Sequence, residues 1–113
     1  MIKIYHNNRC SKSRSGVAIL EDSGKEFEII KYLDTPPSFR ELTEIINLLN
    51  ISPIELVRKN EKIWKENFKG KKLSENEIIT AMVENPKLIE RPIVINGNKA
   101  VIGRPPEKIS TVL

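Results

Sequence analysis

Hydrophobic and polar residues follow two different periods in the first third of the chain. Alternation over residues 2–5 predicts a strand, and apolar positions after Lys12 follow helical spacing as far as Ser23-Gly24. The segment 26–33 is rich in β-branched and aromatic residues, which favours a second strand. Because a helix separates the two strands, they are expected to run parallel in a right-handed βαβ unit.

The middle of the chain carries helix signals instead. Ser38 followed by Glu41 is a capping-box pattern, and the apolar positions after it predict a helix to about Leu49. Three more helical pieces are expected within residues 52–84: one from Pro53, one around Trp64, and one from Ser74 with Glu77 as a second capping box.

The end of the chain predicts a β-hairpin. Two short apolar runs, 91–95 and 100–103, flank an Asn96-Gly97 turn, and a short helix is expected towards Val112. The parallel pair and the hairpin can complete one four-stranded mixed sheet. We therefore predict an α/β, thioredoxin-like fold for residues 1–113 as a single domain, with a helical insertion at about 38–88.

Composition narrows the class of protein. The 113 residues carry a net charge of +4, which is weak evidence for nucleic-acid binding, and no apolar run approaches the roughly 20 residues needed to cross a bilayer. The only cysteine, Cys10, excludes an internal disulfide and a Cys-rich zinc site within one chain. With no secretory pattern at the start, the expected location is the cytoplasm.

Cys10 is the first candidate for chemistry. It lies in the predicted loop between a strand and a helix, where helix amides and the cations Arg9, Lys12 and Arg14 favour a thiolate. The alternative reading is a buried and inert cysteine, because free cysteines are among the most buried residues.

Around Cys10 the sequence resembles the glutaredoxin-coupled arsenate reductases. The resemblance spans nearly the whole chain in five ordered blocks: residues 5–14, 32–37, 56–60, 90–94 and 103–105. A chain that ends at Leu113 is similar to the shorter branch of that family. The resemblance implies the same thioredoxin-like fold with a helical insertion that the residue pattern predicts.

The resemblance also implies roles for individual side chains. Cys10 would be the nucleophile, and Arg58, Arg91 and Arg104 would bind the oxyanion, since arginine offers bidentate hydrogen bonds and a permanent charge. Ser13 would hydrogen-bond the sulfur, Arg14 would add positive potential, and His6 would tune the thiol. The alternatives are a helix cap for Ser13, a surface role for the arginines and a structural role for His6.

The implied reaction needs electrons from outside the chain. Cys10 attacks arsenate, glutathione attacks the resulting ester, and glutaredoxin resolves the mixed disulfide. The expected partners are therefore arsenate, glutathione as co-substrate and glutaredoxin, with no bound cofactor, no metal, no membrane and no nucleic acid. A monomer is expected.

Three other functions fit parts of the pattern. Spx-type transcription regulators, which bind RNA polymerase, share the fold, but many carry a second cysteine where this chain has Ser13. A general glutaredoxin-like oxidoreductase would need Cys10 but not Arg58 or Arg104. An inactive relative could act as a binding module.

Overall fold

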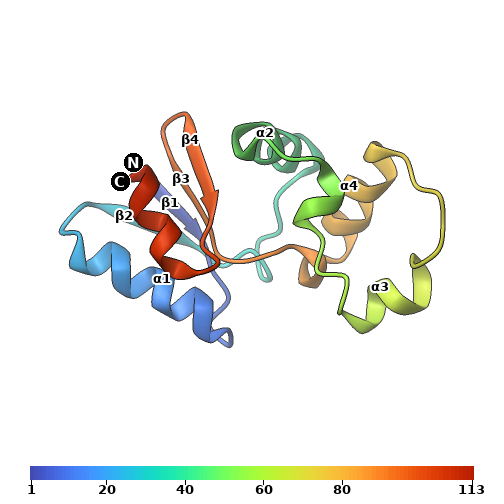
Figure 1. The fold of residues 1–113 in the computed structure, drawn as a ribbon, viewed down its shortest axis with the longest axis horizontal. Coiled ribbons are helices and arrows are strands. Elements are labelled where there is room, and N and C mark those ends of the chain that lie inside the picture. The colour runs from blue at the N-terminus through green and yellow to red at the C-terminus, as the bar shows by residue number, and fades with distance from the viewer. The chain divides into compact units, whose positions relative to one another are not determined.

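Four strands form one mixed sheet in the order β2-β1-β3-β4 (Figure 1). In this computed structural model, which describes residues 1–113, β1 is parallel to β2 and antiparallel to β3, which pairs antiparallel with β4. The predicted α/β fold and mixed sheet are confirmed. The strands are β1 (Ile2–Tyr5), β2 (Phe27–Ile30), β3 (Ile93–Asn96) and β4 (Lys99–Ile102).

The second strand is shorter than the sequence indicates. We expected it over 26–33, whereas it ends at Ile30, which is opposite Tyr5 at the end of β1. Since β2 lies at the edge of the sheet and pairs only with β1, later residues have no strand to pair with. They form a turn instead, in which the Lys31 carbonyl accepts hydrogen bonds from the N–H groups of Asp34 and Thr35.

The chain divides into two compact units, residues 1–35 with 91–113, and residues 36–90. In the first unit, helix α1 (Ser11–Asp22) and the 3-10 helix η3 (Pro106–Val112) pack with the sheet around one apolar core. The buried members of that core are Ile2, Ile4, Leu20, Val94, Ile109 and Val112.

Gly103 follows β4 where the first unit is tightly packed. A Cβ atom at this position would lie 2.9 Å from Pro92 Cγ and 3.0 Å from Ile109 Cδ1. Such distances are too short for ordinary packing, so a residue without a side chain lets the chain pass close to Pro92. The next residue along the chain is Arg104.

The second unit is helical, as predicted. Ser38 and Ser74 both form complete capping boxes, with Glu41 and Glu77 respectively. The short helix η2 was not expected; Pro86 begins it directly after α4. The helices of this unit are α2 (Phe39–Leu49), η1 (Pro53–Leu56), α3 (Lys62–Asn67), α4 (Glu75–Glu84) and η2 (Pro86–Leu88). None of the helices in the protein is long and apolar enough to span a membrane.

Candidate active site

Asn7 accepts two hydrogen bonds that shape the loop between β1 and α1. The Asn7 carbonyl accepts from the Cys10 N–H at 3.0 Å, and its side-chain oxygen accepts from the Arg9 N–H at 3.0 Å. Cys10 is the residue that caps α1, and its carbonyl accepts the Arg14 N–H. The loop therefore holds Cys10 at the amino end of the helix.

The Cys10 sulfur is partly buried and lies among hydrogen-bond donors. The N–H groups of Ser13 and Lys12 reach it from the first turn of α1. These donors and the positive end of the helix favour a negatively charged sulfur. The amino end of α1 is thus suited to a thiolate.

Two arginines from the C-terminal part of the chain also reach the sulfur. Arg104 Nη2 lies 3.5 Å from Cys10 Sγ, and the Arg91 side chain also hydrogen-bonds the sulfur. Arg104 Nε donates to the Arg91 carbonyl at 2.8 Å, so the two residues are connected. The peptide bonds from Arg91 to Pro92 and from Arg104 to Pro105 are both cis.

These donors determine the ionisation of the thiol. Partial burial by itself raises the pKa of Cys10, but the Ser13 N–H, the Arg91 side chain and the Lys12 N–H lower it. The net result is a pKa below the usual range of cysteine. A larger fraction of Cys10 is therefore thiolate at neutral pH than for a free cysteine.

A pH profile of Cys10 alkylation tests this ionisation. Because only the thiolate reacts, the rate with iodoacetamide falls as the pH drops through the pKa, and the midpoint should lie below the ~8.5 of a free cysteine. Replacing Arg91 with alanine should shift the midpoint upwards, because a hydrogen bond and a positive charge are lost. Arg40→Ala, which removes an exposed cation from α2, should leave it unchanged. Equal midpoints in all three proteins would show that Arg91 does not act on the sulfur.

His6 and Ser13 form a buried pair beneath the loop. The Ser13 hydroxyl lies 2.6 Å from His6 Nδ1 and accepts a hydrogen bond from the Asn7 N–H at 2.9 Å. Burial lowers the pKa of His6, and the charges of Lys31 and Arg14 lower it further, while contacts with Asn8 and Ser13 oppose the shift. The ring is therefore neutral at neutral pH, and the hydroxyl of Ser13 faces His6 and Asn7 while its N–H reaches the sulfur.

Removing the Ser13 hydroxyl should lower the free energy of unfolding but have little effect on the reactivity of the Cys10 thiol. Ser13→Ala leaves His6 Nδ1 and the Asn7 N–H without this partner inside the protein, at a cost of about 1–3 kcal/mol in the free energy of unfolding. Urea unfolding measures this loss, and Ser15→Ala, on the exposed face of α1, is the control. If Ser13→Ala kept the wild-type stability but raised the pKa of Cys10, the Ser13 hydroxyl would have to hydrogen-bond the sulfur instead of His6 and Asn7.

The side chains of the remaining two predicted site residues, Arg14 and Arg58, bind other partners than the sulfur. Arg14 is exposed, and its Nη1 donates to the Asn8 carbonyl at 2.8 Å, so its side chain supports the loop. Arg58 belongs to the second unit, where Nη1 donates to Glu90 Oε1 at 2.7 Å and Nε lies 3.7 Å from Glu61 Oε1. The structure thus brings Cys10 together with His6, Ser13, Arg14, Arg91 and Arg104, all in the first unit.

Two residues that position the predicted site residues were not identified from the sequence. Asn7 shapes the loop, and its position two residues before Arg9 is the spacing of an Asx turn, so a local signal was present. Glu90 pairs with Arg58 from 32 residues away, and no local pattern indicates that contact.

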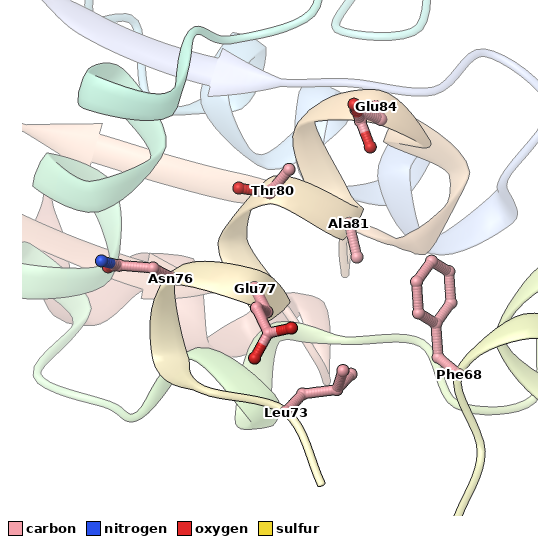
Figure 2. Close-up of a pocket in the computed structure, with 7 residues that line it drawn as sticks. All are labelled: Phe68, Leu73, Asn76, Glu77, Thr80, Ala81 and Glu84. Atoms are coloured by element: carbon pink, nitrogen blue, oxygen red, sulfur yellow. The ribbon is translucent and has the colours of Figure 1, made fainter. Parts of the chain in front are cut away.

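A cavity in the second unit fits an oxyanion poorly. It has a volume of about 300 Å³, and Figure 2 shows Phe68 and Leu73 facing side chains of α4. Its charged lining residues are Glu77 and Glu84, and Glu77 already accepts the Ser74 N–H in the capping box. No group of three or more His, Cys, Asp or Glu side chains in the protein could hold a metal ion.

The chemistry available around Cys10 is nucleophilic attack on an anion. A thiolate is a good nucleophile, and two guanidinium groups beside it can offset the repulsion between the sulfur and an incoming oxyanion. Their planar donor geometry also matches the oxygens of a tetrahedral anion.

Comparison with known proteins identifies the family. The model of the ArsC family matches residues 5–112. The chain is 46% identical to YfgD of Escherichia coli K12, named an uncharacterized protein, over 99% of this chain and 96% of that one. It is 42% identical to the arsenate reductase of Neisseria meningitidis serogroup A, over 99% and 97%. The solved structure of the arsenate reductase from Vibrio cholerae has a TM-score of 0.94 at 43% identity, over 99% and 97%. The chain therefore belongs to the ArsC family.

Proposed function

We propose that this protein is an arsenate reductase in which Cys10 is the nucleophile. The observation that carries the proposal is the placement of Cys10 Sγ at the start of α1, 3.5 Å from Arg104 Nη2 and hydrogen-bonded by Arg91. Membership of the ArsC family and the names of similar proteins support arsenate as the substrate.

The first step is attack by the Cys10 thiolate on arsenic. A sulfur–arsenic(V) bond forms and one arsenate oxygen leaves as hydroxide or water. Arg91 and Arg104 hold the remaining oxygens, and their charge counters the meeting of two anions. The amino end of α1 keeps the sulfur ionised before attack.

The second step requires an external thiol, because the chain contains one cysteine. Glutathione attacks the Cys10 sulfur, a disulfide forms between the two sulfurs, and the sulfur–arsenic bond breaks. The bonding pair stays on arsenic, which is reduced from arsenic(V) to arsenite by two electrons, while the two thiols are oxidised to the mixed disulfide. Glutaredoxin then uses a further glutathione to release Cys10. No bound cofactor takes part, and the requirement for reduced thiols suits the cytoplasm.

The other residues support this chemistry. The buried hydrogen bond between His6 and Ser13 holds the Cys10 loop in place. Arg14 donates a hydrogen bond to the Asn8 carbonyl and adds positive potential to the site. We assign Arg58 to oxyanion binding on the family resemblance; within its own unit it is paired with Glu90 and Glu61. The protein is proposed to act as a monomer.

A coupled assay tests the proposal. Purified protein with arsenate, glutathione and glutaredoxin should form arsenite well above the rate of the same mixture without protein. Absence of arsenite, together with reduction of a protein or small-molecule disulfide, would instead indicate a general oxidoreductase. Absence of both, with recovery of RNA polymerase in a pulldown, would indicate a regulator of the Spx type.

A further inference from the structure

A polar cavity of about 280 Å³ lies beside the Cys10 loop, and the mechanism above does not use it. All of its lining residues belong to the first unit. They are His6, Asn8, Arg9, Lys31, Leu33 and Asp34.

One wall of the cavity is the Cys10 loop itself. Arg9 directly precedes Cys10, and the Asn8 carbonyl is held by Arg14 Nη1 at 2.8 Å. His6, also in this wall, lies 2.6 Å from the Ser13 hydroxyl through Nδ1. A molecule in the cavity would therefore lie next to the loop that presents the sulfur.

The other wall is the turn that follows β2. Its residues Lys31 and Asp34 are linked by a hydrogen bond from the Asp34 N–H to the Lys31 carbonyl at 3.0 Å. This turn places one cation and one carboxylate at the edge of the cavity, and Leu33, 37% exposed, adds an apolar surface.

The charges of the cavity form a pattern. Its lining offers two cations, Arg9 and Lys31, and one carboxylate, Asp34. The complementary ligand carries two carboxylates and one ammonium group, because like charges placed together are unfavourable and opposite charges attract. A simple anion such as arsenate would be attracted by the two cations but repelled by the carboxylate of Asp34, because it carries no positive group.

The proposed second step calls for a thiol beside Cys10. We propose that this cavity binds the reducing thiol, and that it selects a small thiol peptide with two carboxylates and one ammonium group, for which glutathione is the probe. This inference rests on the proposed function, since that function requires the external thiol. Binding here brings the thiol next to Cys10 and converts its attack from a bimolecular into an intramolecular step.

Disulfide exchange without arsenate provides the test. Glutathione disulfide exchanges with the Cys10 thiolate, so that one glutathione becomes bonded to Cys10 and the other leaves as a thiolate; intact-protein mass spectrometry measures the rate. The comparison reagent is the disulfide of 3-mercaptopropionate, which has carboxylates but no ammonium group. Lys31→Ala should slow both reagents about two- to fivefold, the range of an exposed ion pair. Lys25→Ala, which removes an exposed cation outside the cavity, should slow neither.

The Asp34→Asn variant distinguishes specific binding of the ammonium group from a non-specific electrostatic effect of the cavity on the reaction rate. If Asp34 pairs with the ammonium group, this variant reacts more slowly with glutathione disulfide but faster with the propionate disulfide. Faster reaction with both reagents would mean that the charges act only as a field, and unchanged rates would mean that the cavity is not used; either result overturns the inference. Arsenite formation by the wild type, measured separately, shows whether the proposed function itself holds.

Discussion

Replacing Cys10 with serine is expected to abolish arsenite formation, with a fall of about 10³-fold or more in turnover. The hydroxyl of serine is not ionised near neutral pH, so the donors that stabilise a sulfur anion have no nucleophile to act on. The same variant should form no mixed disulfide with glutathione. Arsenite production in the presence of glutathione and glutaredoxin measures the first effect.

The control for this substitution is Ser15→Ala, on the exposed face of the same helix, which should retain full turnover. Because serine differs from cysteine by one atom, the urea concentration at the midpoint of unfolding should be the same for Cys10→Ser as for the wild type. A Cys10→Ser protein that still reduces arsenate would remove Cys10 from the reaction.

Replacing Arg104 with alanine should have the second largest effect, a loss of about 10²-fold in kcat/KM for arsenate. The change removes the nitrogen that lies 3.5 Å from Cys10 Sγ and the bond that Nε makes to the Arg91 carbonyl. Both the oxyanion and the position of the second arginine are affected. Arg104→Lys keeps the charge but not the planar pair of donors, so its loss should be intermediate.

Initial rates over a range of arsenate concentrations measure this effect. The control is Arg40→Ala, whose guanidinium is exposed on α2 and pairs with Glu44. Arg58→Ala in the same assay tests the role that only the resemblance assigns to Arg58. An Arg104→Ala protein with unchanged kcat/KM would place the oxyanion elsewhere.

Elements that depend on neighbouring residues were predictable from the sequence. The capping boxes of Ser38 and Ser74 involve a residue three positions along. The hairpin was also predicted from a local signal, although its turn residues are Gly97 and Asn98, one position later than the expected Asn96-Gly97 turn, because Asn96 pairs with Lys99. The end of β2 was predicted wrongly because it depends on the length of β1, its only partner strand. Local composition cannot report that limit.

The candidate site shows the same division. Cys10 could be identified from its place before a helix, but its contact with Arg104 joins residues 94 positions apart and was proposed only through the family resemblance. The partners of the Ser13 hydroxyl depend on how β1 and α1 pack, so the sequence did not reveal that it faces His6. The pairing of Arg58 with Glu90 was likewise hidden.

A single turnover without glutaredoxin tests whether Cys10 is the nucleophile that is oxidised as arsenate is reduced. Reduced protein is mixed with arsenate and glutathione, quenched in acid, and analysed for arsenite and for glutathione bonded to Cys10. Since arsenic(V) takes up two electrons, one from each sulfur, we expect one Cys10–glutathione disulfide for every arsenite formed. Arsenite released while Cys10 remains a free thiol would contradict the role of Cys10 as the nucleophile.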